Sequence, residues 1–473
     1  MKIVLVNPGQ EFALVGNNPS IIDKERGKNP PLGLLFVAGA MKKEGRHLVH
    51  ILDVSLPNFG LGKFKAYLKE TNCDVLGITI TSFTLLEALQ VIRLFKEVNP
   101  YGKVIAGGPH VSIFPKETVN LGLVDVAVKR EGEPVINEIL DRIAEPRSLG
   151  EVGGICFKLN GEVIDTGNAP YIEVLDSLPI PDRALLPYKE YYSLLGCDSY
   201  STTIFTSRGC PFQCAFCDRP ALGKKFRFHS PTYVVKEILQ CVDLGIREFL
   251  FYDDTFTLNR KRVLEICEHI VELGLDIYWD IRTRVDTVDE EMLRALKKAG
   301  CRAVHYGVES GSEKILERLN KGITIPQVKE AFYSTRKIGM ETLAYFMVGN
   351  PGETMADIEK SLELASEIKP DFLHLTIFTP FPATRLYQEG LNSGIIEKDV
   401  WWEFAANPSP DFTPPFWEEK FTKDELQEIV IKAYKNFYLR PGYIWRRLLR
   451  LRSLSEFKRK AKAGLSVLKM GKK

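Results

Sequence analysis

Short apolar runs alternate with helix-like periodic segments through the first 145 residues. Helical periodicity is clear at Leu34–Lys43 and Leu85–Glu97. The apolar runs lie at Lys2–Asn7, Leu48–Val54, Asp74–Thr81, Lys103–Gly107 and Val124–Lys129. Continuous apolar runs separated by helices are typical of buried parallel strands. The pattern predicts a doubly wound, Rossmann-like α/β domain over residues 1–145, in which ligands bind beyond the carboxyl ends of the strands.

Residues 146–200 break this rhythm. Asn160-Gly161 separates two short segments and is typical of a tight hairpin turn. A proline-rich stretch follows at 178–182. We expect an inter-domain linker that carries a small β hairpin.

The alternation of strand and helix returns over residues 201–385. Six strands are predicted, at Thr202–Ser207, Glu248–Asp253, Asp276–Arg282, Ala303–Glu309, Thr342–Val348 and Phe372–Thr379. Six such units fit an open (βα)6 barrel of the TIM type, three quarters of the eightfold version. Residues 386–473 are expected to form a C-terminal helical, basic region.

Charge is distributed unevenly along the 473 residues. The formal net charge is +2, yet residues 432–473 hold 14 Lys and Arg against one acid, Glu456. The remaining chain is therefore acidic, which argues for a local anionic contact of the tail and against a nucleic-acid binder. No stretch of 18 apolar residues occurs. We expect a cytoplasmic protein, whose nine cysteines serve metal binding, catalysis or packing.

Three of those cysteines cluster directly after the first predicted barrel strand. Cys210, Cys214 and Cys217 are spaced so that one loop can wrap three thiolates around one small object. A [4Fe–4S] cluster normally has four cysteine ligands, so three leave one iron open to a chelating substrate. S-adenosylmethionine (SAM) cleavage requires such an open iron. A structural zinc site with His229 as the fourth ligand is the alternative.

The spacing Cys-x3-Cys-x2-Cys, with Phe216 just before the last cysteine, resembles the radical SAM signature. The resemblance implies that residues at later strand ends hold SAM. Asp253 or Asp254 would contact the methionine amino group, and Arg282 and Arg284 would reach its carboxylate. Further implied contacts, to the ribose or methionine end and beside the adenine, are Glu309, Ser310, Gly349 and Gly352. Ordinary turn chemistry for the two glycines and a solvated ion pair for the two arginines remain open alternatives.

A doubly wound domain placed before such a barrel resembles the cobalamin-binding class of radical SAM enzymes. The resemblance implies that strand-end loops hold the corrin and its nucleotide tail. The candidate contacts are Pro31, Leu32, Gly33, Thr81, Ser82, Gly107, Gly108, His110, Glu131 and Gly132. The Asp-x-His-x-x-Gly motif that supplies a histidine to cobalt is missing from this sequence. His110 could take that place, with loop packing or a hydrogen bond to the tail as the alternative.

This class of enzyme implies an activity and a set of partners. SAM would be split into methionine and a 5′-deoxyadenosyl radical with an electron from a donor such as flavodoxin or ferredoxin. The radical would abstract hydrogen from a small-molecule or lipid substrate, and an unactivated carbon would be methylated. Cyclisation, rearrangement or oxidation by an enzyme of the same class is an alternative. A corrinoid-binding sensor with a structural metal is the non-enzyme alternative.

The C-terminal tail combines apolar and basic residues. Within residues 443–462, eight Lys and Arg lie among apolar residues that include Trp445, Leu448, Leu449, Leu451 and Phe457. A basic amphipathic helix with tryptophan is typical of a membrane-surface anchor. Packing of the same helix on the barrel is the alternative. In the first case the cytoplasmic enzyme would be membrane-associated and its substrate would be a lipid.

Overall fold

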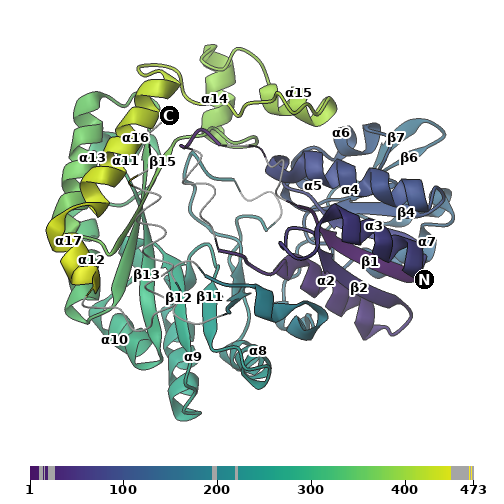
Figure 1. Ribbon diagram of the computed structural model, residues 1–473, viewed down its shortest axis with the longest axis horizontal. Helices are drawn as coiled ribbons and strands as arrows, with labels where there is room; N and C mark the ends of the chain where they lie inside the picture. The colour runs from purple at the N-terminus through teal and green to yellow at the C-terminus, as the bar shows by residue number, and fades with distance from the viewer. Residues whose placement is uncertain are drawn as a thin grey trace.

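The computed structural model describes residues 1–9, 14, 16–19, 27–193, 196, 200–218, 222–448, 468 and 470. Two sheets rich in parallel strands form its two main parts. Figure 1 shows the N-terminal part at the right and the second part at the left, with the last helices on the outer side of the second. The predicted Rossmann-like domain, partial barrel and C-terminal helices therefore occur in that order.

The N-terminal sheet has seven strands in the order β2-β1-β3-β4-β5-β6-β7, and β1 to β5 are parallel. All five predicted apolar runs form strands: β1 (Lys2–Asn7), β2 (Leu48–Asp53), β3 (Val75–Thr79), β4 (Lys103–Gly107) and β5 (Val126–Val128). Ile3 and Leu5 face one side of the sheet, whereas Val4 and Val6 face the other, because strand side chains alternate. Both sides are buried, as an apolar run without polar alternation requires.

Helices cover both faces of this sheet. α2 (Leu32–Lys43) and α7 (Ile136–Arg142) pack on the face of Ile3 and Leu5. α3 (Gly60–Thr71), α4 (Leu85–Val98) and α6 (Pro115–Asn120) pack on the opposite face, and the short α5 (Pro109–Ile113) follows β4.

The predicted hairpin exists, but it belongs to the N-terminal sheet rather than to a separate linker. β6 (Ile155–Leu159) and β7 (Glu162–Asp165) turn at Asn160-Gly161, where both residues have positive φ angles of 52° and 90°. β6 pairs antiparallel with β5. The first sheet thus extends to Asp165, beyond the expected boundary at residue 145, because the edge of β5 offers backbone groups for pairing.

The second sheet has six parallel strands in the order β15-β14-β13-β12-β11-β8. They are β8 (Thr202–Ile204), β11 (Glu248–Phe251), β12 (Tyr278–Thr283), β13 (Cys301–Glu309), β14 (Glu341–Val348) and β15 (Phe372–Ile377). This confirms the six predicted strands. The first is interrupted: β9 (Ser207–Arg208) separates from β8 and pairs with β10 (Arg227–Phe228) in a small antiparallel sheet.

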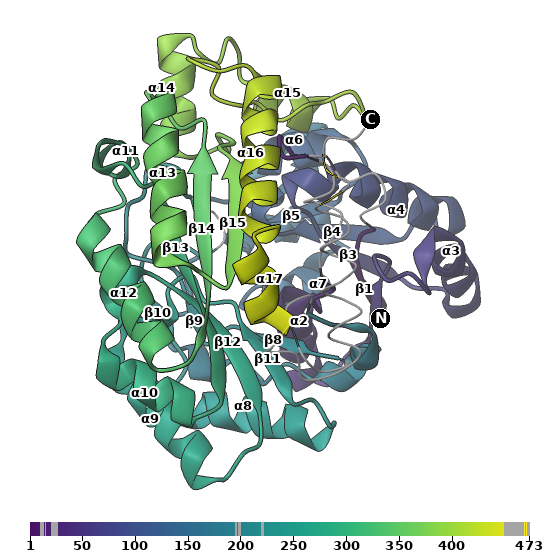
Figure 2. The ribbon, with the colours of Figure 1, turned by 60° about the vertical axis from the view of Figure 1, so that its left-hand side comes forward.

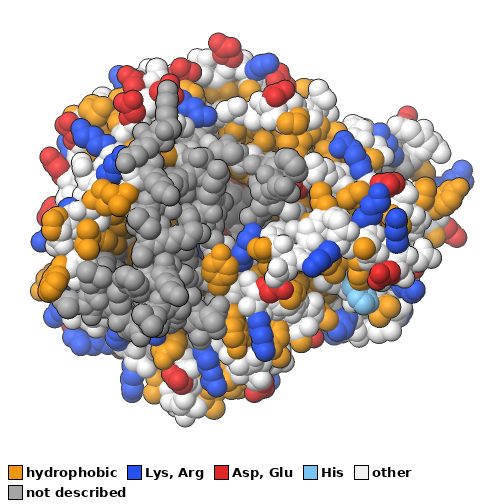
Figure 3. All heavy atoms as spheres, in the orientation of Figure 1, with side chains coloured by type: hydrophobic (Ala, Val, Ile, Leu, Met, Phe, Trp, Pro, Cys, Tyr) orange, Lys and Arg blue, Asp and Glu red, His pale blue; other side chains and the backbone are white. Residues whose placement is uncertain are grey.

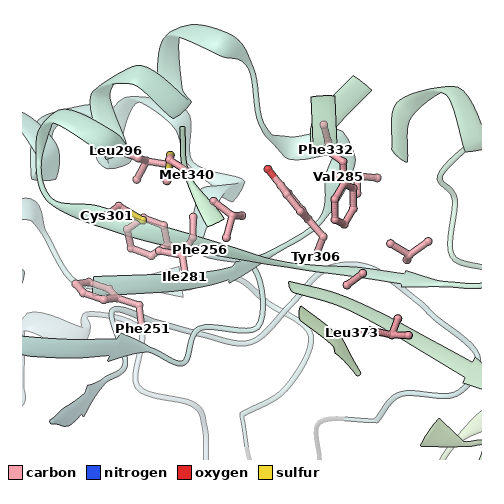
Figure 4. Close-up of a cluster of buried hydrophobic side chains, with 14 of the residues drawn as sticks. Phe251, Phe256, Ile281, Val285, Leu296, Cys301, Tyr306, Phe332, Met340 and Leu373 are labelled. Carbon is pink, nitrogen blue, oxygen red and sulfur yellow. The ribbon is translucent and has the colours of Figure 1, made fainter. Parts of the chain in front are cut away.

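Helices lie between consecutive barrel strands and cover one face of the second sheet (Figure 1). They are α8 (Pro231–Asp243), α9 (Arg260–Glu272), α10 (Glu290–Lys298), α11 (Glu313–Arg318), α12 (Ile325–Lys337) and α13 (Met355–Ile368). Figure 4 shows part of this core, where Phe251, Phe256 and Ile281 meet Leu296 and Met340. The core residues of each strand alternate with residues on the opposite, inner face of the sheet.

The C-terminal region follows the barrel and closes its edge. α14 (Arg385–Ser393), α15 (Val400–Ala406), α16 (Lys423–Tyr438) and α17 (Pro441–Leu448) are its helices. Figure 2 shows α16 beside β15, the last strand of the sheet. The Tyr438 hydroxyl accepts a hydrogen bond from Leu373 N and donates one to Leu373 O, both at 2.9 Å. Tyr434 contacts both backbone groups of Leu375 in the same way, at 3.2 and 3.4 Å.

Two segments join the barrel to the N-terminal domain. Trp401 of α15 is fully buried in the hydrophobic cluster of α3 and α4, and the Trp402 indole donates to Glu117 of α6 at 2.9 Å. Between β1 and α2, the Asn18 side chain accepts from Ile377 N at 2.9 Å, while Asn29 donates to the Tyr252 hydroxyl at 2.8 Å. The chain that follows β1 therefore contacts the edge strand β15 and also the end of β11, near the opposite edge of the barrel sheet.

No helix in the described part of the chain is long and apolar enough to cross a membrane. On the face drawn in Figure 3, Lys and Arg side chains are interspersed with Asp and Glu over the N-terminal domain. Most of the basic tail, from residue 449 to 467, lies outside the described residues.

Candidate functional site

The three clustered cysteines lie in one loop after β9, at the carboxyl end of the first barrel strand. Gly209 begins this loop with a φ of 80°, and a Cβ there would lie 2.3 Å from the Lys225 carbonyl oxygen. Only glycine fits such a position. Cys210 is buried, whereas Cys214 and Cys217 are partly exposed. The loop can therefore face a small ligand from its open side.

Residues 319–322, after α11, support this loop from beneath, and nothing in their sequence pattern singled them out. Leu319 O accepts a hydrogen bond from Ala215 N at 2.8 Å. Asn320 donates to Gln213 O at 2.7 Å. Leu319 and Asn320 thus fix the backbone of a loop more than a hundred positions earlier in the chain.

Lys321 is the functional candidate that the sequence analysis missed. Its ammonium is buried, donates to Glu309 at 2.7 Å and lies 5.7 Å from the centre of the Phe216 ring. Glu309 was predicted to hold SAM, and it ends β13 with an unusual φ of 72° at a register shift. Strain of this kind is common where a side chain is aimed at a ligand. Lys321 and Glu309 together place one charge of each sign beside the cysteine loop.

Arg284 lies beside the cysteines, but an acid already holds its guanidinium. It donates two hydrogen bonds of 2.9 Å to Asp286, and its Nη1 lies 4.0 Å from Cys214 Sγ. The guanidinium also stacks on Phe212 at 3.8 Å from the ring centre. Arg284 therefore contacts the cysteine loop at Cys214 and Phe212. Its contact with a SAM carboxylate stays a prediction.

The zinc alternative finds no support in the geometry. His229 stacks on Tyr233 at 3.8 Å between ring centres, and its Nδ1 lies 3.2 Å from Asp176. Burial lowers the pKa of His229 to about 4. Within the described ranges, no three His, Cys, Asp or Glu side chains come close enough to hold one metal ion. A cubane cluster makes no such demand, because each thiolate binds a different iron.

The two adjacent aspartates after β11 occupy different environments. Asp253 is fully buried and accepts hydrogen bonds from Thr206, at 2.8 Å, and from Ser207. Burial raises the pKa of Asp253 above its ordinary value. Asp254 is exposed. Asp253 therefore organises the strand that carries the cysteines, and a contact from Asp254 to the methionine amino group stays a prediction.

The remaining SAM candidates also have structural partners. Ser310 is buried and lies 3.2 Å from the Ser361 hydroxyl. Gly349 and Gly352 both have positive φ angles, which fits the turn interpretation. Arg282 stacks on the Tyr252 ring at 3.4 Å from its centre. Their contacts with SAM stay predictions.

A cavity of about 350 Å³ lies at the N-terminal domain's border with the barrel. Its floor is the sheet face under α2 and α7, with Leu5, Gly77 and Ile105. Five of the ten predicted cobalamin residues line it: Gly33, Gly107, Gly108, Glu131 and Gly132. A Cβ at Gly33 would meet no atom within 4 Å, and one at Gly107 none within 3.8 Å, so both glycines leave open space at the wall. The wall facing the barrel includes Phe205, Arg208 and Leu222.

The other five predicted cobalamin residues lie elsewhere. Pro31 precedes α2, and Leu32 is buried in the domain core. Thr81 caps the short helical turn that contains Ser82. His110 is buried, with its Nδ1 3.0 Å from the Ser82 hydroxyl. None of these five is among the residues that line the cavity.

A buried ion network joins the cavity to the cysteine strand. Arg208, two residues before Cys210, donates to Glu131 at 2.8 Å and to Glu133 at 2.7 Å. Arg227 donates to both oxygens of Glu131 at 2.9 and 2.8 Å. All four side chains are less than a tenth exposed. Glu131 therefore fixes the two domains to each other, a role that its sequence position did not reveal.

Comparison with known proteins gives the same two parts. The family described as "Radical SAM superfamily" matches residues 204–365, and the one described as "B12 binding domain" matches residues 20–140. An uncharacterized methyltransferase of Pyrococcus horikoshii is 34% identical over 448 residues, 93% of each chain. The chain belongs to the B12-binding radical SAM enzymes.

Other relatives show the breadth of this family. The anaerobic magnesium-protoporphyrin IX monomethyl ester cyclase of Cereibacter sphaeroides is 30% identical over 94% of this chain and 72% of its own. Among solved structures, the radical SAM methyltransferase TsrM from Kitasatospora setae has a TM-score of 0.72 at 17% identity, covering 93% of this chain and 89% of its own. At that identity the likeness shows the shared fold.

The B12-binding radical SAM family uses a [4Fe–4S] cluster, SAM and cobalamin, and the site fits each group. Three thiols in one loop beside Arg284 suit the cluster. The glycine-lined cavity suits a flat organic group that approaches the backbone closely.

Burial lowers the pKa of His110 to about 4, and its Nε2 has no hydrogen-bond partner among the described residues. Its place outside the cavity wall supports loop packing over cobalt ligation.

Proposed function

We propose that this radical SAM enzyme transfers a methyl group to an unactivated carbon of a small-molecule substrate. One observation carries the proposal: the cavity assigned to cobalamin reaches the strand that leads into the cysteine loop. Arg208 lines that cavity and lies two residues before Cys210. A methyl donor and a hydrogen-abstracting group must both face the same carbon, so adjacent cofactor sites are what this reaction requires.

When bound, the cluster would supply the electron that SAM cleavage needs, and cobalamin would supply the methyl group. The chain's own residues position them. Arg284 and Lys321 bring positive charge to the cysteine loop, at Cys214 and at the Phe216 ring. The ion network of Glu131 with Arg208 and Arg227 holds the two domains in register.

The names of the relatives support methyl transfer and leave ring formation as one alternative reaction. The relative with 34% identity is named a methyltransferase, and further relatives are named for methylation of a phosphonate, a hopanoid and a bacteriochlorophyllide. The cyclase of Cereibacter sphaeroides, at 30% identity, favours ring formation as the second candidate. Both reactions need an electron donor.

Isotope transfer separates these activities. The anaerobically reconstituted enzyme, with cobalamin and a reductant, receives SAM carrying a trideuterated methyl group and a metabolite extract from cells that lack the gene. We expect 5′-deoxyadenosine together with a product that carries the deuterated methyl group. Cys214→Ala should abolish both, whereas Cys241→Ala, which changes a buried cysteine outside the loop, should abolish neither. A dehydrogenated or ring-closed product without label would establish the second candidate instead.

We further propose that the basic tail contacts an anionic membrane surface. On α17, Tyr443 packs on α16, while Ile444 and Trp445 are 43% and 67% exposed. Each Lys or Arg near an anionic bilayer contributes about 1 kcal/mol. We expect salt-sensitive binding to anionic liposomes, no binding to neutral ones, and weaker binding when residues 443–473 are deleted. If the full chain ignores anionic liposomes at low salt, the tail has no membrane role.

A further inference from the structure

The inner face of the barrel sheet carries polar side chains that neither the cluster site nor the cavity uses. On β12, Trp279 and Ile281 point into the hydrophobic core under the helices. Asp280 therefore points to the opposite face, because strand side chains alternate. By the same alternation, His305 of β13 and Tyr345 of β14 lie on that inner face, opposite the core residues Val304 and Ala344.

Three of these side chains form one contiguous group. His305 Nε2 lies 3.6 Å from Asp280 Oδ2, and His305 Nδ1 lies 3.4 Å from the Tyr345 hydroxyl. The imidazole is only 3% exposed. The Tyr345 ring in turn meets His374 of β15 edge to face, at 5.4 Å between centres. The group thus extends across four neighbouring strands of the inner face.

This group is not saturated by the protein. Neither Asp280 Oδ1 nor His305 Nε2 has a hydrogen-bond partner among the described residues, although both atoms are buried. Burial raises the pKa of Asp280 to about 7 and lowers the pKa of His305 well below its ordinary value. Buried polar atoms in folded proteins are nearly always paired, with protein, water or ligand. An unpaired acceptor on the face opposite the helices of the core is therefore a place for a ligand.

The rim above the group is ordered by contacts from both domains. Arg282, two residues nearer the carboxyl end of β12, stacks on Tyr252, whose hydroxyl accepts a hydrogen bond from Asn29. The cysteine loop follows the first barrel strand at that same carboxyl end. A molecule bound at Asp280 would therefore lie below the cluster end of the barrel, with the rim between them.

We propose that Asp280, with His305 beside it, binds the substrate by accepting a hydrogen bond from an N–H or O–H group. The inference rests on the proposed function and narrows its substrate class. The substrate carries a hydrogen-bond donor on the part that lies below the rim and is not a plain hydrocarbon. A site built around a buried acceptor discriminates strongly against analogues that lack the donor, because the acceptor would stay unpaired.

Binding without turnover tests this site separately from the chemistry. Wild-type holoenzyme, loaded with cluster, cobalamin and SAM but given no reductant, is incubated with a metabolite extract and washed. The retained small molecules are then compared by mass spectrometry with those held by Asp280→Leu, Asp280→Asn and Asp276→Asn. Leucine keeps the branching at Cγ and removes both acceptor oxygens, whereas asparagine keeps one. Asp276 is an exposed residue just before the same strand, so its variant is the matched control.

We expect at least one metabolite to be retained by the wild type and by Asp276→Asn, and to fall tenfold or more in Asp280→Leu. Asp280→Asn should retain an intermediate amount. Cobalamin absorbance and iron content, unchanged in every variant, would show that folding and cofactor loading are intact. Equal retention by the wild type and Asp280→Leu, or no retention by the wild type, would overturn the site. Failure of methyl transfer is scored separately, by the absence of deuterated product.

Discussion

Replacing Glu131 by glutamine leaves two buried arginines facing one carboxylate, that of Glu133. In the native protein the Glu131 oxygens accept hydrogen bonds from Arg208, from Arg227 and from the backbone of Ile172, all between 2.8 and 2.9 Å. Glutamine keeps one acceptor oxygen and turns an amide NH2 group toward a guanidinium. The substitution therefore removes one negative charge from the network and one of the two acceptor oxygens of residue 131.

The expected loss can be worked from these contacts. A hydrogen bond to a charged group contributes about 1.5–3 kcal/mol, and two such bonds lose their acceptor. Breaking a buried ion pair by removing one partner costs about 3–5 kcal/mol, which agrees with that sum. We therefore expect Glu131→Gln to lower the free energy of unfolding by about 3–5 kcal/mol. Because Arg208 precedes Cys210 by two residues, iron content should fall as well.

Urea unfolding followed by circular dichroism, at a fixed cobalamin concentration, measures this effect. Urea is preferable to guanidinium because it does not screen ion pairs. Glu173→Gln is the matched control: Glu173 pairs with Lys225 at the surface, with both side chains more than 60% exposed. Exposed pairs contribute little, so the control should leave the midpoint nearly unchanged. The reasoning is refuted if Glu131→Gln is no less stable than Glu173→Gln.

Three further predictions follow from the site. Cys210→Ala, Cys214→Ala and Cys217→Ala should each lose iron and 5′-deoxyadenosine formation; full turnover in any one would show that this cysteine is not a ligand. His110→Ala should leave the electron paramagnetic resonance spectrum of bound cob(II)alamin unchanged, and nitrogen splitting from a protein imidazole in the wild type would contradict this. Burial raises the pKa of Glu353 from the ordinary 4.5 to about 7, so folding takes up a proton there and stability should fall as pH rises from about 4.5 to 7. Glu353→Gln should make the urea midpoint less dependent on pH in that window, and an unchanged slope would show that Glu353 does not titrate there.

The strands were predictable because each is a local pattern. The run from Ile3 to Val6 must be buried on both faces, and the two domains around the sheet follow from several such runs. The cysteine loop was equally local, since its chemistry lies within eight residues. Prediction ended where contacts join distant parts of the chain. The Asn160-Gly161 turn predicted a hairpin but carried no information about the edge that it joins.

Partners across the sequence explain the remaining differences. Glu131 follows a strand end, and this position predicts a cofactor contact. Its side chain instead accepts hydrogen bonds from Arg208 and Arg227, which lie 77 and 96 residues away in the sequence. Lys321 lies in an ordinary turn after a short helix, and its importance depends on folding beneath Phe216. Such roles are set by tertiary packing, which residue spacing alone does not encode.

The tyrosine pairing along β15 has a consequence for assembly. An open barrel ends in a strand whose backbone donors and acceptors invite another strand to add to it, and this is a common route to aggregation. The Tyr434 and Tyr438 hydroxyls each bond to the N–H and the carbonyl of one residue of β15. The Tyr443 hydroxyl donates to Asp371 O, just before the strand. Polymerisation through this edge would first require α16 to detach. Replacing the two tyrosines of α16 by phenylalanine would keep the aromatic packing but leave the backbone groups of Leu373 and Leu375 unpaired. α16 should then detach more readily, and strand-to-strand polymers should form at a lower urea concentration than in the wild type.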